Sequence, residues 1–231
     1  MNDVINLDKL DGRYIDLDQY AENVDVVGKW KGDRLVFKGK KPTKLVLDHC
    51  TIETTRTEAD KNAIAFAEDV DGLEILGVGC TIVGGIAFWK GIKNTTIQSL
   101  NIYYPNIGIH AAKDFEVRNF TIRDCKVVGA QREGIYIGPH TPRKTPANNI
   151  LIFNNKFHWC GWDPAQANGQ NVTIKDNLFD NCCTLKEKNQ DWAITIQPGS
   201  LAFIENNRFL NTPNNIQILD SRGFVRNNTY C

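Results

Sequence analysis

A five-residue motif that recurs along the chain restricts the fold more than any other feature. Each copy has cysteine, leucine or asparagine in its third place and closes on an apolar residue. The copies DHCTI, VGCTI, QSLNI, RDCKV, FNNKF, KDNLF, ENNRF and RNNTY end at Ile52, Ile82, Ile102, Val127, Phe157, Phe179, Phe209 and Tyr230. Successive ends lie 30, 20, 25, 30, 22, 30 and 21 residues apart. A minimum near 20 with variable additions is typical of a solenoid whose loops leave one corner.

A second short segment lies between the motif copies and alternates an aliphatic residue with another type. Its copies are AIAFA, IAFWK, IGIHA, GIYIG, AITIQ and IQILD. A period of two indicates a strand with one buried face. The coil between Phe157 and Phe179 has no clean copy, and we expect its GWDPAQANGQN segment to distort that coil. Together the two sets of strands predict an all-β fold, a parallel β-helix of about eight coils.

The third place of the motif predicts a column of stacked side chains. It holds cysteine or leucine in the first four copies and Asn155, Asn177, Asn207 and Asn228 in the last four. Like positions of stacked coils lie about 4.8 Å apart, so buried asparagines can hydrogen-bond along the row. For Cys50, Cys80 and Cys125, packing is a simpler explanation than metal or redox chemistry.

The first 45 residues fit the repeat less well than the remainder. YIDLDQY, VDVVGKW and RLVFKG indicate short strands with polar turns between them. We therefore expect residues 1–45 to form an N-terminal cap or irregular first coils, and residues 46–231 to form the β-helix. A cap hides the open end of a solenoid.

The charge balance and the cysteines exclude several classes of protein. Lys plus Arg equals Asp plus Glu at 27 each, so no basic excess favours nucleic acid. No apolar run is long enough for a membrane span. An odd count of seven cysteines and an acidic N-terminus without a secretory signal argue against a secreted disulfide framework. We expect no cofactor and no metal, although His158 and Cys160 near Cys182 and Cys183 leave a zinc site open as an alternative.

The NN-x-F turns and aliphatic strands of residues 45–231 resemble the right-handed parallel β-helix superfamily, the pectin-lyase-like proteins. That superfamily includes pectate and alginate lyases, polygalacturonases and bacteriophage tailspikes. The resemblance implies a carbohydrate that lies along the outer face of the stack. The acidic residues of polygalacturonases and of calcium-dependent pectate lyases are not matched here, and fold alone confers no activity.

The outward side chains of the second strand form the first candidate site. One outward row is predicted to hold Tyr136, and the next to hold Trp89, His110 and Gln197. The aromatic faces could stack on sugar rings, and the amide could bond hydroxyl groups. Packing against the N-terminal segment or a neighbouring subunit explains the same residues equally well.

The corner before this strand forms the second candidate site. It carries Arg132 and Glu133, then Asp163, then Asp191, with the acids 30 and 28 residues apart. Successive coils would stack the acids, with neighbours near 5 Å apart. Paired carboxylates suit glycoside hydrolysis, and crowded like charges raise one pKa. Polar corners of a solenoid are also rich in Asp and Glu for solvation alone.

Three functions are consistent with the sequence. The first is a tailspike-like bacteriophage protein, made in the host cytoplasm and located in the virion, that binds host-surface polysaccharide and either cleaves it or does not. As such spikes are trimers, the resemblance implies a homotrimer and contacts with other virion tail proteins. The second is a free polysaccharide lyase or glycoside hydrolase. The third is a purely structural virion protein.

Overall fold

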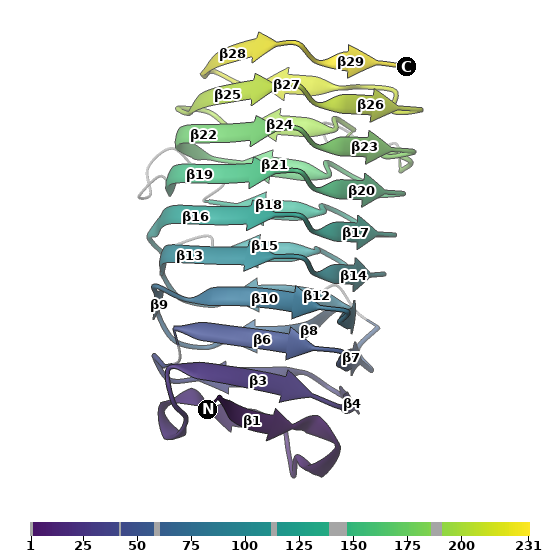
Figure 1. The fold of residues 1–231 in the computed structure, drawn as a ribbon. Coiled ribbons are helices and arrows are strands. Elements are labelled where there is room, and N and C mark those ends of the chain that lie inside the picture. The colour runs from purple at the N-terminus through teal and green to yellow at the C-terminus, as the bar shows by residue number, and fades with distance from the viewer. Residues whose placement is uncertain (1, 42, 58–60, 112–114, 139–146, 186–190) are drawn as a thin grey trace.

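The chain forms a stack of coils in which every pairing between strands is parallel. The computed structural model describes residues 2–41, 43–57, 61–111, 115–138, 147–185 and 191–231. Each regular coil contributes one strand to each of three long sheets, and the stack rises from the N-terminus to the C-terminus (Figure 1). The described residues hold only two short helical turns, so the predicted all-β parallel β-helix is confirmed.

The three sheets have the following strands. Sheet A contains, in order, β1 (Asp3–Asn6), β3 (Asn23–Val27), β6 (Lys44–Asp48), β10 (Glu74–Val78), β13 (Ile92–Gln98), β16 (Val117–Arg123), β19 (Ala147–Phe153), β22 (Gly169–Lys175), β25 (Leu201–Glu205) and β28 (Arg222–Arg226), and β9 (Val70–Asp71) pairs with β13 beside it. Sheet C contains β4 (Lys29–Gly32), β7 (Thr51–Thr54), β11 (Thr81–Val83), β14 (Asn101–Tyr103), β17 (Lys126–Val128), β20 (Lys156–His158), β23 (Leu178–Asp180), β26 (Arg208–Leu210) and β29 (Thr229–Tyr230). Sheet B contains β2 (Tyr14–Asp16), β5 (Leu35–Lys38), β8 (Asn62–Phe66), β12 (Gly85–Phe88), β15 (Ile109–Ala111), β18 (Ile135–Ile137), β21 (Ala165–Ala167), β24 (Ile194–Ile196) and β27 (Ile216–Ile218).

The recurring motif supplies sheet C, and its last residues form a single column. Ile52 pairs with Ile82, and the same register continues through every later copy to Phe209 and Tyr230. Phe157, Phe179 and Phe209 stack with ring centroids 5.0 and 5.1 Å apart. The predicted column is therefore confirmed, and it lies in the core up to Phe209.

The asparagine column forms the predicted ladder. The Nδ2 group of Asn155 donates to Oδ1 of Asn177 at 3.1 Å, and Asn177 and Asn207 each donate to the next asparagine at 3.0 Å. Each Oδ1 also accepts the backbone N–H of the residue one coil earlier, as Asn177 does from Asn155 at 2.9 Å. Asn155, Asn177 and Asn207 are buried, and the paired amides of the row satisfy backbone groups at the corner of each of these coils.

The coil that the sequence predicts to be distorted is regular. Ala165 pairs with Ile135 on one side and with Ile194 on the other, so β21 keeps the register of its neighbours. Alanine replaces the larger aliphatic residue at the two inward positions of this strand. Small inward residues preserve the alternation of inward and outward side chains, but they weaken the aliphatic pattern by which the strand is recognised in the sequence.

The two ends of the stack differ. At the N-terminal end, η1 (Leu7–Lys9) and η2 (Leu17–Gln19) bury their leucines, and Asp8 accepts the backbone N–H of Lys29 at the edge of sheet C. Strands β1 to β5 pair within the three long sheets, which adds coils to the eight counted from the motif. The division of the chain at residue 45 stays a prediction.

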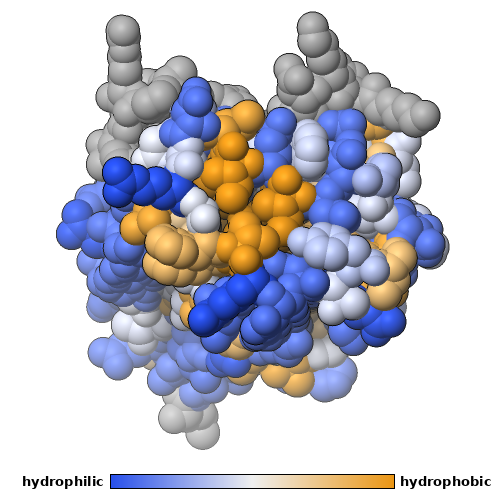
Figure 2. Space-filling view, turned by 90° about the horizontal axis from the view of Figure 1, so that it is seen from above, coloured by the Kyte–Doolittle hydropathy of each residue, from blue (hydrophilic) through white to orange (hydrophobic). Residues whose placement is uncertain are grey.

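At the C-terminal end the core is open. Ile216 and Ile218 are partly buried, whereas Val225 and Tyr230 are exposed although their columns are core columns one coil earlier. Figure 2 looks down on this end and shows apolar side chains gathered at its centre inside a hydrophilic rim. The asparagine ladder and the phenylalanine column thus end on an uncovered face.

Candidate functional site

The turns that lead from sheet C to sheet B, here called the C-to-B turns, hold the predicted acidic corner. Glu133 and Asp163 occupy the same place in adjacent coils, because Ile135 pairs with Ala165. The predicted column therefore forms between these two acids. Asp191 lies one residue earlier in its own turn, since the backbone position level with Asp163 belongs to Trp192.

Asp163 is fully buried, with 0% of its surface exposed, and this burial dominates its chemistry. Its Oδ1 atom accepts the backbone N–H of Trp192 at 3.1 Å. The pKa of Asp163 is raised from 3.8 to about 6, with burial as the largest cause. The Thr195 hydroxyl and the Trp192 N–H act to lower this pKa, and the charges of Glu133 and Asp191 act to raise it. A carboxyl group with this pKa can exchange a proton near neutral pH.

Arg132 connects the acidic pair to an aromatic ring. Its Nε lies 3.5 Å from Oε2 of Glu133, and its guanidinium carbon lies 4.2 Å from the ring centroid of Trp162. Glu133 is 1% exposed, so the guanidinium compensates a carboxylate that has almost no contact with water. Asp191 is only partly buried and accepts a hydrogen bond from Asn214 at 2.8 Å. The catalytic roles predicted for the three acids stay predictions.

The outer face of sheet B carries one continuous polar row beside these acids. Its side chains occupy like positions in five coils, namely His110, Tyr136, Gln166, Thr195 and Gln217. The rings of His110 and Tyr136 lie 5.4 Å apart. Tyr136 is only 2% exposed, and the stacking role predicted for it stays a prediction.

Trp89 and Gln197 lie outside that row. The inward pairs Ile86–Ile109 and Phe88–Ala111 set the register, which puts His110 level with Ala87 rather than with Trp89. Trp89 is partly exposed just beyond β12, and the guanidinium of Arg34 lies 5.1 Å from its ring. Contact with the N-terminal segment, one of the two explanations that the sequence allowed for Trp89, is therefore present.

Gln166 is a candidate that sequence reasoning missed. It is fully buried on the outward side of β21, and neither of its amide atoms has a hydrogen-bond partner among the described residues. Buried polar atoms without partners are rare in folded proteins and often mark a binding site. The register of β21 could have revealed it, because an AQA strand places its middle residue outward.

The cysteines do not form a reactive centre in the described residues. Cys50, Cys80, Cys125, Cys160, Cys182 and Cys183 are buried free thiols, and only Cys231 is exposed. Burial raises the pKa of Cys50 and of Cys125 to about 12, so these thiols stay protonated. Within the described residues, no group of three or more His, Cys, Asp or Glu side chains could hold a metal ion. The helical turns in that part of the chain are too short to cross a membrane.

Comparisons with known proteins concern the same coils. Residues 107–230, more than half of the chain, match the family model described as a right-handed beta helix region. Among solved structures, an alginate lyase from Paenibacillus sp. strain FPU-7 is similar at 13% sequence identity and a TM-score of 0.46, with 90% of each chain covered. The comparison with curated proteins finds no match. The acidic C-to-B turns lie inside the matched segment.

Proposed function

The chain belongs to the right-handed β-helix family, and from this premise we propose that it is a tailspike-like virion protein that binds and cleaves host-surface polysaccharide. The observation that carries the proposal is the buried pair Glu133–Asp163 in adjacent C-to-B turns. Two carboxyl groups in unlike environments are what acid-catalysed glycoside cleavage needs.

Asp163 is the proposed general acid. Its raised pKa of about 6 keeps it protonated in mildly acidic solution, so that it can donate a proton to a glycosidic oxygen. Thr195, whose hydroxyl lowers that pKa, lies one coil further along the outer row. Cleavage should therefore be fastest below pH 6 and decline as the pH rises through the pKa of Asp163.

Glu133 is the proposed nucleophile. The guanidinium of Arg132 lies near its carboxyl group and would offset the negative charge of the nucleophile. Adjacent coils lie about 4.8 Å apart, which matches the separation of roughly 5 Å in retaining glycosidases. The carboxylate would attack the anomeric carbon as the proton from Asp163 departs with the leaving sugar, and Asp163 would then activate the water that releases the glycosyl group.

The polar row on sheet B is the proposed substrate-orienting surface. Gln166 supplies a buried amide whose donor and acceptor have no described partners, and Thr195 lies directly beside it in the row. Because Gln166 and Thr195 are 0% and 1% exposed, they would orient the acids, whereas sugar hydroxyls would meet the row at its partly buried ends, His110 and Gln217. Trp89 and Gln197, at the edge of the same face, are the proposed outer contacts.

The test is release of reducing ends from capsular and lipopolysaccharide glycans by the intact protein. We expect cleavage by the unchanged protein, and its loss in Asp163→Asn and Glu133→Gln without a fall in the melting midpoint. Glycan that survives prolonged incubation with the unchanged protein would refute the cleavage step.

A second candidate is binding without cleavage, and one observation favours it. Glu133 and Asp163 are 1% and 0% exposed, which suits acids that only stabilise a corner. This candidate predicts that glycan binds and stays intact, and that Asp163→Asn changes stability alone.

Location in a virion and trimeric assembly are part of the proposal. The buried thiols suit a protein made in a reducing cytoplasm. The outer face of sheet A carries Leu151, Phe153, Phe203 and Phe224, and three such faces can be buried by closed symmetry. Light scattering should give a mass three times that of the chain, and particles purified from infected cells should contain the protein. A monomer at micromolar concentration would contradict the trimer.

A further inference from the structure

In six consecutive C-to-B turns, from the turn after β11 to the turn after β26, the first residue has a positive φ. Hydrogen bonds between coils align these residues, as the N–H of Tyr104 donates to Val128 and the N–H of Gly129 donates to His158. The row is Gly84, Tyr104, Gly129, Trp159, Asn181 and Asn211, and every member has a positive φ. Glycine and asparagine suit this conformation, whereas bulky aromatic residues adopt it rarely.

Tyr104 and Trp159 keep this unfavourable conformation without burying their rings. Their φ angles are 51° and 53°, and their exposed fractions are 59% and 60%. A ring that is more than half exposed gains little from the hydrophobic effect to offset backbone strain. Neither the turn nor the core therefore explains an aromatic residue at these two places. Strained, exposed residues are found disproportionately at binding sites.

The two rings flank a glycine at the middle of a three-coil surface. A Cβ atom added to Gly129 would lie 2.8 Å from the Tyr104 ring, so this ring rests over the Gly129 backbone. Trp159 lies one coil beyond Gly129. It is therefore two coils, or about 9.6 Å, from Tyr104 along the stack. The imidazole of His158 lies 6.3 Å from the Trp159 ring. The rings thus form two contact points along one line parallel to the solenoid axis.

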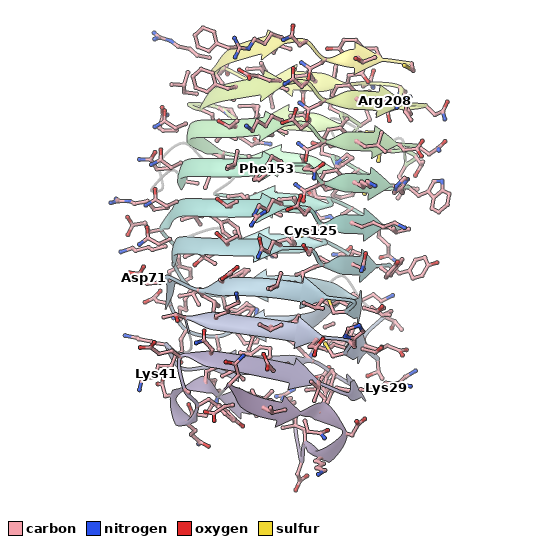
Figure 3. All side chains as sticks on the ribbon, in the orientation of Figure 1. Lys29, Lys41, Asp71, Cys125, Phe153 and Arg208 are labelled. Atoms are coloured by element: carbon pink, nitrogen blue, oxygen red, sulfur yellow. The ribbon has the colours of Figure 1, made fainter. Side chains whose placement is uncertain are left out.

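Three positive side chains share one column on the outer face of sheet C, three residues before this line in each coil. Lys126 pairs with Lys156, and the column continues through Leu178 to Arg208. Figure 3 shows Arg208 on the side of the stack that sheet C forms. Lys156 and Arg208 are exposed. Cations next to aromatic faces complement a chain of sugar rings that carries anionic groups.

We propose that Tyr104 and Trp159 form an aromatic platform that binds an anionic glycan chain lengthwise along the stack and delivers it to the acidic C-to-B turns. This inference rests on the proposed function and assigns it two positioning residues. Trp159 is three residues before Trp162 in one turn, so the platform and the Arg132–Trp162 contact belong to neighbouring parts of the same surface.

The experiment measures affinity and stability together in the full chain. Calorimetric titrations use two probes, a hexasaccharide of uronic acids and a neutral hexasaccharide of glucose. Trp159→Asn and Tyr104→Gly remove the two rings. They introduce asparagine and glycine, the residue types that other members of the row have at this backbone conformation. Trp159→Phe keeps an aromatic ring, and Tyr14→Asn removes an exposed ring near the N-terminal end as a matched control.

We expect the uronic acid probe to bind more tightly than the neutral probe. Trp159→Asn and Tyr104→Gly should each raise the Kd at least tenfold with an unchanged or higher melting midpoint, whereas Trp159→Phe and Tyr14→Asn should stay within threefold. If the unchanged protein binds the probe and the Asn and Gly variants bind equally well, the platform is wrong while the proposed function stands. If the unchanged protein binds neither probe, the platform for an anionic glycan is overturned, whereas the proposed function falls only if capsular and lipopolysaccharide glycans also stay unbound and intact.

Discussion

Replacement of Asp163 by asparagine should change how the stability of the fold depends on pH. The pKa of this acid is about 6 in the folded protein and 3.8 in an ordinary environment. The folded state therefore holds the proton more tightly than the unfolded chain. The stability that protonated Asp163 contributes is fully present below pH 3.8 and is lost as the pH rises through about 6.

The size of the effect follows from the difference of about two pKa units. At about 1.4 kcal/mol per unit, the ionised carboxylate costs the fold about 3 kcal/mol at pH 8. Asparagine keeps an acceptor for the Trp192 N–H and cannot ionise. Between pH 4 and pH 8, Asp163→Asn should therefore gain about 2–3 kcal/mol relative to the unchanged protein.

The assay is urea unfolding at half-unit pH steps, with both proteins measured in the same buffers. Thr195→Val tests the origin of the effect, because removal of the hydroxyl should raise the pKa of Asp163 and move the loss of stability to higher pH. The same substitution made in the Asp163→Asn background should no longer shift any pH dependence. A difference between Asp163→Asn and the unchanged protein that stays constant from pH 4 to pH 8 would refute the reasoning.

The remaining predictions concern the ladder, the core and the site. Asn177→Leu should cost about 1–3 kcal/mol in urea unfolding, because buried donors and acceptors of the ladder lose their partners, and an unchanged midpoint would count against the ladder. Phe179→Ala should cost about 3–5 kcal/mol, because it empties the middle of a stacked column; a loss below 1 kcal/mol would mean that the column repacks. Asp191→Asn should abolish reducing-end release if Asp191 takes part in cleavage, and full activity would remove it from the site. Trp89→Ala should raise the KM more than it lowers kcat, because stacking holds substrate and transition state about equally; an equal loss in both would place Trp89 nearer to the chemistry.

The motif was sufficient to predict the fold because one physical requirement repeats in every coil. A side chain that stacks on its own kind must recur at the same place, so Ile52 and Tyr230 could be assigned to one column without a structure. A second ladder was missed although it follows the same rule. Asn94, Asn119 and Asn149 have positive φ angles and hydrogen-bond to one another on the surface, at 2.7 and 2.9 Å. Each stands three residues before a buried isoleucine, which is a detectable signal.

The candidate site was predicted less completely because its parts depend on register within variable turns. The spacing of Glu133 and Asp163 in the sequence was enough to predict that they stack, because the C-to-B turns that carry them have the same length. Asp191 follows a longer insertion, and one residue of difference moves it out of their column. Burial could not be predicted at all, because alternation shows which side chains point outward but not what covers them. Tyr136 is outward and buried for this reason.

The coils that contain the stabilising asparagine ladder and phenylalanine column also contain two destabilising features of the proposed site, the buried acid and the strained tryptophan. The asparagine ladder and the phenylalanine column run from residue 155 to the C-terminal end. The buried acid Asp163 and the strained ring of Trp159 lie within the same coils, on the C-to-B turns. Natural proteins tend to break local rules at functional sites and to compensate elsewhere. The asparagine ladder stabilises the corner of each coil. This stabilisation can offset the free-energy cost of the buried Asp163 and of the positive φ of Trp159 in the same coils. Asn177→Leu should therefore lower glycan affinity as well as stability, although, among the described residues, the Asn177 side chain hydrogen-bonds only within the ladder and to the backbone of Ile152 and Lys175.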